Sequence, residues 1–125
     1  MPDTIHANYS YSRYWGVFFD STQKLVGYGY SGDVAHFNKP EMDHLPKMGP
    51  LPSGPYRLHY IADDPKLGPH IFQLEPIGSF PLYGRSGFYI HGDSPALNHT
   101  GSEGCIVCPP VVRDIFKDGD ILAVV

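Results

Sequence analysis

Glycine and proline punctuate this chain so closely that long helices are excluded. The 125 residues include fourteen glycines and thirteen prolines, spread along the sequence without a period. Because both residues disfavour the interior of a helix and both are common in turns, this distribution predicts short strands joined by turns. Nine tyrosines and seven phenylalanines agree with that interpretation, since aromatic side chains are frequent in strands.

Alternating side chains identify the individual strands. The pattern is clearest at residues 55–62, where Arg57 and His59 alternate with apolar and aromatic residues. A proline at the start of 109–116 predicts one or two turns of helix. Residues 31–54 carry four prolines and no period, which predicts a long ordered loop of the functional kind. Further strands are predicted at 14–19, 24–30, 70–77, 87–92, 104–108 and 121–125, the first two joined by a turn at 20–23.

These elements predict one mostly-β domain, a sandwich or barrel with one or two short helices. No repeat and no linker divides the sequence, so the domain is expected to span residues 1–125, with 1–13 as a short N-terminal extension. The chain is long enough to bury a core without disulfides or a structural metal.

Charge and hydropathy exclude several classes of partner. The formal net charge of −4 and the lack of a basic stripe argue against a nucleic-acid partner. No apolar run approaches the roughly 20 residues of a membrane-spanning helix. The first residues lack the basic and apolar segments of a signal peptide, so we expect synthesis in the cytoplasm and another route to any site outside it.

The segment FYIHGDSPALNHTGSEGCIVCPP concentrates the residues that can carry chemistry. Cys105 and Cys108 have C-x-x-C spacing, and His91, Asp93 and His99 lie near them, which is one pattern of a zinc site. No second C-x-x-C exists, however, and the histidines lie eight residues apart. A redox dithiol is a second interpretation, but such motifs occur at a helix N-terminus after a strand, and this chain has almost no helix.

Two further interpretations remain for the same segment. Cysteines are often small buried hydrophobic residues, and this interpretation fits Cys108, which has no charged or glycine neighbour. Cys105 instead follows Gly104, which allows the backbone amides and the sulfur to converge on one point. His91 ends a predicted strand. If the strands of His91 and Cys105 are neighbours, the imidazolium would lower the pKa of the thiol and later protonate a leaving amine.

The sequence IHGD followed by SEGCI resembles the signature of L,D-transpeptidases of the YkuD type. In that family a histidine-glycine pair precedes a Ser/Thr-x-Gly-Cys motif, and here the interval from His91 to Cys105 is fourteen residues. The upstream sequences SG at 31–32 and MGPLPSGPYRL at 48–58 are similar to the compact Tlde1-like branch. Members of that branch are type VI secretion effectors delivered into the periplasm of rival bacteria. The resemblance covers residues 15–125.

This resemblance assigns roles to individual residues. It implies that Cys105 is the nucleophile and His91 the general base, with the Gly92 carbonyl orienting the imidazole. It further implies an oxyanion hole made by the backbone amides of Gly104 and Cys105, in a turn that the Ser102 hydroxyl supports. No metal and no organic cofactor is required.

The chain departs from the usual YkuD motif at two positions. Glu103 stands where a histidine usually precedes Gly-Cys, and Val107 stands where an arginine often follows the cysteine. Arg113 and Arg85 are candidates to contact a substrate carboxylate in place of that arginine, and Glu103 is a third candidate substrate-binding residue. For each of the two arginines the more common interpretation is a charge on the solvated surface.

Several polar and aromatic residues have a plain and a functional interpretation. Asp93 is most simply a turn residue, and His99 is most simply a loop residue that faces solvent. Four aromatic residues near the N-terminus are most simply explained as core residues, although they could also line a groove for a glycan-peptide substrate. They are Tyr14, Trp15, Tyr28 and Tyr30.

Together the resemblance implies an L,D-transpeptidase or L,D-carboxypeptidase that acts on peptidoglycan stem tetrapeptides through a thioacyl-enzyme. It implies an antibacterial effector, active in the periplasm of a target bacterium and neutralised by a cognate immunity protein. The alternative from another class is a non-enzymatic β-domain clipped by zinc, acting as a binding module of a secretion or phage particle.

Overall fold

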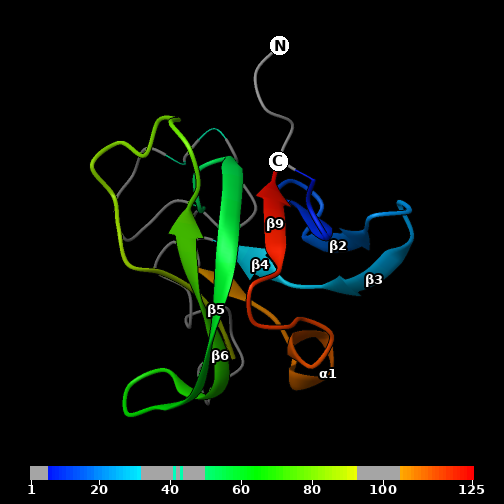
Figure 1. Cartoon of the computed structure of the whole chain (residues 1–125), viewed down its shortest axis with the longest axis vertical. Coiled ribbons are helices and arrows are strands. Elements are labelled where there is room, and N and C mark those ends of the chain that lie inside the picture. Colours follow the sequence, from blue (N-terminus) through cyan, green and yellow to red (C-terminus); the bar gives the residue numbers. More distant parts are fainter. Residues whose placement is uncertain (1–5, 32–40, 42, 44–49, 93–104) are drawn as a thin grey trace.

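The computed structural model describes residues 6–31, 41, 43, 50–92 and 105–125. Within this part of the chain it shows nine strands and one short helix, so the mostly-β prediction is confirmed (Figure 1). No helix there has the length and apolar character that a membrane crossing requires. The elements are β1 (Tyr9–Ser12), β2 (Val17–Asp20), β3 (Leu25–Tyr28), β4 (Tyr30–Ser31), β5 (Gly54–Asp64), β6 (Gly68–Pro76), β7 (Phe88–His91), β8 (Ile106–Val107), α1 (Pro110–Arg113) and β9 (Ile121–Val124).

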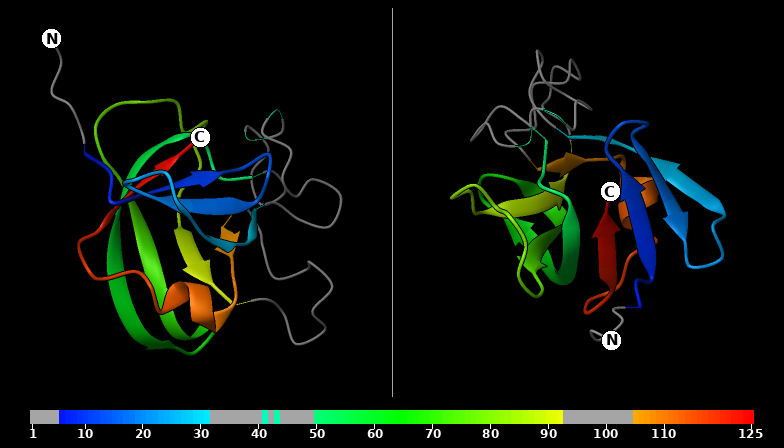
Figure 2. Two further views of the ribbon diagram at one scale, coloured as in Figure 1. Left: turned by 90° about the vertical axis from the view of Figure 1, so that its right-hand side faces the viewer. Right: turned by 90° about the horizontal axis from the view of Figure 1, so that it is seen from above.

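All the described strands belong to one sheet, in the order β3-β2-β1-β9-β5-β6-β7-β8-β4. The pairs β1–β9 and β7–β8 are parallel, and the others are antiparallel. Figure 2, seen from above, shows the N-terminal strands and the β5–β6 pair on opposite sides of β9. The strands β3 and β4 form the two edges and do not pair with each other, so the sheet is not closed into a barrel.

The connection between the two edges forces the sheet to curl. Only Gly29 separates β3 from β4 in the sequence, so the flanking Cα atoms lie at most about 7 Å apart. A flat sheet of nine strands would place its edges roughly 38 Å apart, at about 4.8 Å per strand. The two halves of the sheet therefore face each other across a core, as in a sandwich.

Gly29 also packs tightly against β8, the strand next to the edge strand β4. A Cβ added there would lie 2.4 Å from the Val107 carbonyl oxygen and 3.1 Å from Cys108 Cβ. Immediately after it, β4 pairs with β8, with Tyr30 opposite Val107 and Ser31 opposite Ile106. The short strand β8 is thus held between β7 on one side and β4 on the other.

Aromatic side chains join the two halves of the sheet inside the curl. The ring of Phe116, just after α1, packs against two other rings. Its centroid lies 5.2 Å from that of Phe18 on β2 and 6.0 Å from that of Phe72 on β6. Val112 of α1 packs against β3, where a Cβ added to Gly27 would lie 2.7 Å from it. The segment from 110 to 116 therefore fills the core between strands that are far apart in the sheet.

The strand predictions agree with the structure from residue 55 onward and differ from it in the N-terminal part. The segments predicted at 55–62 and 70–77 correspond to the long strands β5 and β6. The single strand predicted at 24–30 is instead two strands, β3 and β4, at opposite edges of the sheet. Residues 14–16, predicted as the start of a strand, lie in the turn before β2. Part of the segment expected to be an N-terminal extension lies in the sheet instead. There β1 pairs with β2 and β9, and Tyr11 is fully buried in the core.

Candidate active site

His91 is the last residue of β7, and Cys105 immediately precedes β8, the parallel neighbour of β7. Ile90 of β7 is opposite Ile106 of β8, and His91 is opposite Val107. Because Ile90 and Ile106 both belong to the core, the alternation of side chains places His91 and Val107 on the other face. The condition that the strands predicted at 87–92 and 104–108 are neighbours is therefore met.

The His91 ring is fixed by the residue that follows it. Its Nδ1 atom lies 2.7 Å from the Gly92 carbonyl oxygen, and the side chain is 4% exposed. A carbonyl oxygen can only accept, so Nδ1 carries the proton and Nε2 keeps a lone pair. The hydrogen bond expected from the sequence is therefore present, and Nε2 is the atom that could accept a proton.

Cys105 lies in a buried position near the start of β7. Its side chain is 9% exposed, and its Sγ donates to the Gly87 carbonyl oxygen at 3.7 Å. Gly87 has a φ of 73°, a left-handed conformation that glycine adopts without strain and that directs this carbonyl. Burial and a hydrogen bond to the protonated form both disfavour the thiolate.

A buried arginine lies close to this thiol. Arg85 is 7% exposed, and its Nη1 donates to the carbonyl oxygens of Pro50 and Asp43, each at 2.5 Å. Its guanidinium carbon lies 5.6 Å from the centre of the Phe88 ring. Burial lowers the pKa of Arg85, while neighbouring acidic groups, Cys105 among them, act in the opposite direction. The expectation that Arg85 is a solvated surface charge is wrong.

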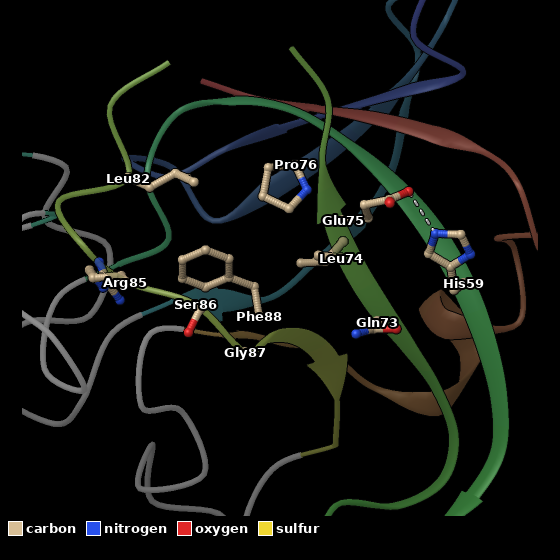
Figure 3. Close-up of a pocket in the computed structure, with 10 residues that line it drawn as sticks. All are labelled: His59, Gln73, Leu74, Glu75, Pro76, Leu82, Arg85, Ser86, Gly87 and Phe88. Atoms are coloured by element: carbon tan, nitrogen blue, oxygen red, sulfur yellow. Dashed lines mark hydrogen bonds and ion pairs between the residues drawn. The ribbon is translucent and has the colours of Figure 1, made fainter. Parts of the chain in front are cut away.

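A pocket of about 240 Å³ opens beside Arg85 and Gly87, next to the carbonyl that contacts Cys105 (Figure 3). It has room for on the order of eight water molecules, so it suits one side chain rather than a large ligand. One rim carries an ion pair between His59 and Glu75, with Nε2 and Oε1 3.0 Å apart. The apolar side chains that line it are Leu74, Pro76, Leu82 and Phe88.

The family model of the Tlde1 domain matches residues 26–119, well over half of the chain. The chain belongs to the Tlde1 domain family. This is a family of type VI secretion effectors, and the matched residues include both His91 and Cys105. No curated protein and no solved structure matches the chain.

The second candidate arginine of this Tlde1 domain lies on the other side of the His-Gly pair. Arg113 is 6% exposed, so the surface interpretation is wrong for it as well. Its Nη1 donates to the Pro69 carbonyl oxygen at 3.4 Å and lies 3.3 Å from a Cβ built on Gly92. Its Nε is buried without a hydrogen-bond partner. Its charge acts on Cys108 and favours ionisation of that thiol.

Cys108 belongs to the core rather than to the site. Its side chain is 2% exposed and packs in the main hydrophobic cluster. Burial raises the pKa of this thiol to about 12, so it stays protonated at neutral pH. Neither of the two described cysteines, Cys105 and Cys108, is in a disulfide. These observations agree with the interpretation of Cys108 as a small buried hydrophobic residue.

Other predicted site residues of the Tlde1 domain lie outside the described part of the chain, so their roles stay predictions. Among the residues that are described, no group of three or more histidine, cysteine, aspartate or glutamate side chains could hold a metal ion. The undescribed candidates are Asp93, His99, Ser102, Glu103 and Gly104.

The N-terminal aromatic residues divide into two groups. Tyr30 is 6% exposed, as core packing requires, but Tyr14, Trp15 and Tyr28 are 65%, 74% and 65% exposed. For those three the core interpretation is wrong. Tyr14 and Trp15 lie in the turn between β1 and β2, with ring centroids 5.1 Å apart.

Sequence analysis missed two residues that contact the site region. Gly87 supplies the carbonyl next to Cys105, and the glycines that flank Arg85 could have indicated an irregular segment there. The backbone carbonyl oxygen of Asp43 accepts a hydrogen bond from Arg85. Its carboxylate forms an ion pair with Arg13, with Oδ2 and Nη1 2.7 Å apart. Nothing in the surrounding sequence marks Asp43.

Proposed function

We propose that this Tlde1 domain is a cysteine-dependent L,D-transpeptidase or L,D-carboxypeptidase acting on peptidoglycan stem tetrapeptides. The observation that carries the proposal is the parallel pairing of β7, which ends at His91, with β8, which directly follows Cys105. The Gly92 carbonyl leaves His91 Nε2 as the basic atom. Membership of an effector family supports a target in another bacterium.

In the first half-reaction, Nε2 of His91 takes the proton of the Cys105 thiol. The thiolate attacks the carbonyl carbon of the L-centre residue in an L,D-peptide bond. A carbon–sulfur bond forms and the carbon–nitrogen bond breaks. His91 returns its proton to the nitrogen of the departing D-amino acid, which leaves a thioester on Cys105. The backbone amides of Gly104 and Cys105 are expected to stabilise the oxyanion.

In the second half-reaction, water or the amine of a free D-amino acid attacks the thioester. His91 accepts a proton from the attacking group, the carbon–sulfur bond breaks, and the thiolate takes the proton back. Water gives a shortened stem peptide, and an amine gives an exchanged tetrapeptide. Either product removes the tetrapeptides that a target cell needs as donors for crosslinking.

The pocket beside Gly87 gives the substrate a place to bind. We propose that it takes one side chain of the stem peptide, since its apolar walls suit an aliphatic chain and its rim carries an ion pair. The Gly87 carbonyl contacts Cys105, so a side chain in this pocket would position a nearby peptide carbonyl at the thiol.

Mass spectrometry of purified tetrapeptide muropeptides tests the reaction. Incubation with the protein should release the terminal D-amino acid, and addition of a different D-amino acid should give the exchanged product. The C105A variant should lose both activities. The C108A variant is the matched control and should keep most of them, because Cys108 lies in the core. Equal loss in both variants, or activity in C105A, would refute the assignment of Cys105.

A further inference from the structure

The surroundings of Cys105 pose an electrostatic problem. Nucleophilic attack needs the thiolate, yet the side chain is 9% exposed and its S–H group donates to the Gly87 carbonyl. Desolvation and a hydrogen bond to the neutral form both raise the pKa of a thiol. A fixed positive charge near the thiol would act in the opposite direction and add to the effect of a protonated His91.

Few charged or titratable groups face Cys105 in the described part of the chain. On β7 these are His91 and, by extension of the register, Tyr89. On the segment before β7 it is Arg85, which lines the same pocket as Gly87, whose carbonyl oxygen contacts the thiol. Beyond Arg85 lies Asp43, whose carboxylate is already in an ion pair with Arg13. The strand on the far side of β8 contributes only Tyr30 and Ser31. His91 becomes cationic only after it has taken the thiol proton. Among the described residues, Arg85 is therefore a permanent positive charge on this side of the thiol, and Arg113 lies beside Gly92 and acts on Cys108.

The position of this arginine is fixed by its local structure. Its backbone amide donates to the Leu82 carbonyl oxygen at 2.9 Å, which closes a tight turn. Both central residues of the turn are left-handed, with φ of 55° at Tyr83 and 71° at Gly84. At the other end of the side chain, two backbone carbonyls and the Phe88 ring hold the guanidinium (Figure 3). The charge is therefore set in place before any substrate binds.

We propose that Arg85 is a positioning residue for the nucleophile: its buried guanidinium stabilises the Cys105 thiolate. Its Nη1 donates to two backbone carbonyl oxygens, which fix this end of the guanidinium. The proposal rests on the proposed function only in taking Cys105 as the nucleophile. A fixed opposite charge lowers the pKa of an acid by about one unit or more at short range.

Alkylation of Cys105 by iodoacetamide, followed against pH by peptide mass spectrometry, measures this effect directly. In R85M the midpoint of the profile should move up by about one pH unit, and alkylation below the midpoint should fall about tenfold. The R85K variant keeps the charge and should recover part of the shift. Cys108 should stay unmodified in every folded variant, since it is 2% exposed.

The R13M variant is the matched control. Arg13 binds the Asp43 carboxylate and donates to the Leu51 carbonyl oxygen, so its loss loosens the segment that Arg85 also holds. It is not among the residues that line the pocket beside the thiol. The midpoint in R13M should stay at the wild-type value. Equal shifts in R13M and R85M, or no shift in R85M, would overturn the proposal.

A second measurement uses the wild-type protein alone and does not depend on the folding of a variant. Iodoacetate is an anion and iodoacetamide is neutral, so a nearby positive charge favours iodoacetate. Above pH 8, where an ordinary histidine is neutral, the ratio of the two rates should exceed the ratio for free cysteine. A ratio at or below that of free cysteine would contradict the role of Arg85. Neither readout needs peptidoglycan, so this proposal and the proposed function can fail separately.

Discussion

Replacing Gly29 by alanine should disrupt both the fold and the site. A Cβ at this position would lie 2.4 Å from the Val107 carbonyl oxygen, closer than such contacts allow. The obstacle is backbone of β8 rather than a flexible side chain, so the strand itself has to move. Overpacking in a rigid place costs about 3 kcal/mol, at the upper end of its usual range. At about 4 °C per kcal/mol, the melting temperature should fall by roughly 12 °C.

Thermal unfolding followed by circular dichroism measures the loss of stability, and release of the D-amino acid from tetrapeptides measures the effect on the site. The control is G78A, because Gly78 has a φ of 79° and an added Cβ meets nothing within 4 Å. That change should cost only about 1–2 kcal/mol for the left-handed backbone and leave activity intact. If G29A melts within 2 °C of the wild type, the steric argument for the junction between β3 and β4 is wrong.

Three further results are expected. The L82W variant places a larger side chain in the pocket beside Gly87. The KM for tetrapeptides should therefore rise about tenfold or more, while the rate of Cys105 alkylation stays unchanged. An unchanged KM would exclude the pocket as a substrate site. Chelation with EDTA should leave the activity intact, because Cys108 packs in the core cluster and Cys105 lies outside it, so the two thiols are not expected to share a metal ion. Zinc bound stoichiometrically through both thiols would instead favour the alternative of a zinc-clipped domain. Export of the protein to the bacterial periplasm should stop growth, whereas retention in the cytoplasm or the C105A change should not; equal toxicity in both compartments would argue against a cell-wall target.

Local sequence patterns predicted the strands that have enough residues to show a pattern. The eleven residues of β5 alternate clearly, and their partner β6 does so nearly as well. By contrast, β1 has only four residues, Tyr-Ser-Tyr-Ser, and its place in the sheet depends on partners at both ends of the chain. No local pattern can predict such a pairing.

The candidate site was predictable where two motifs and a strand boundary coincided. His91 ends a strand and Cys105 immediately precedes the next one, so bringing their segments together required only that the two strands be neighbours. The burial of Arg85 and Arg113 was not predictable, because it depends on carbonyl groups from residues distant in the sequence. Trp15 is exposed because it lies in the turn between β1 and β2, whereas the sequence pattern predicted a strand at this position.

The single residue between the two sheet edges has a consequence for how the chain folds. The strand β8 directly follows Cys105, the proposed nucleophile, has only two residues, and pairs with β4 and with β7. Residues of β4 and β8 lie far apart in the sequence, and such contacts form slowly, because a long loop must close before they stabilise anything. We therefore expect Cys105 to reach its final position only when the whole sheet has closed around the core. An incompletely folded chain would then be an inactive one.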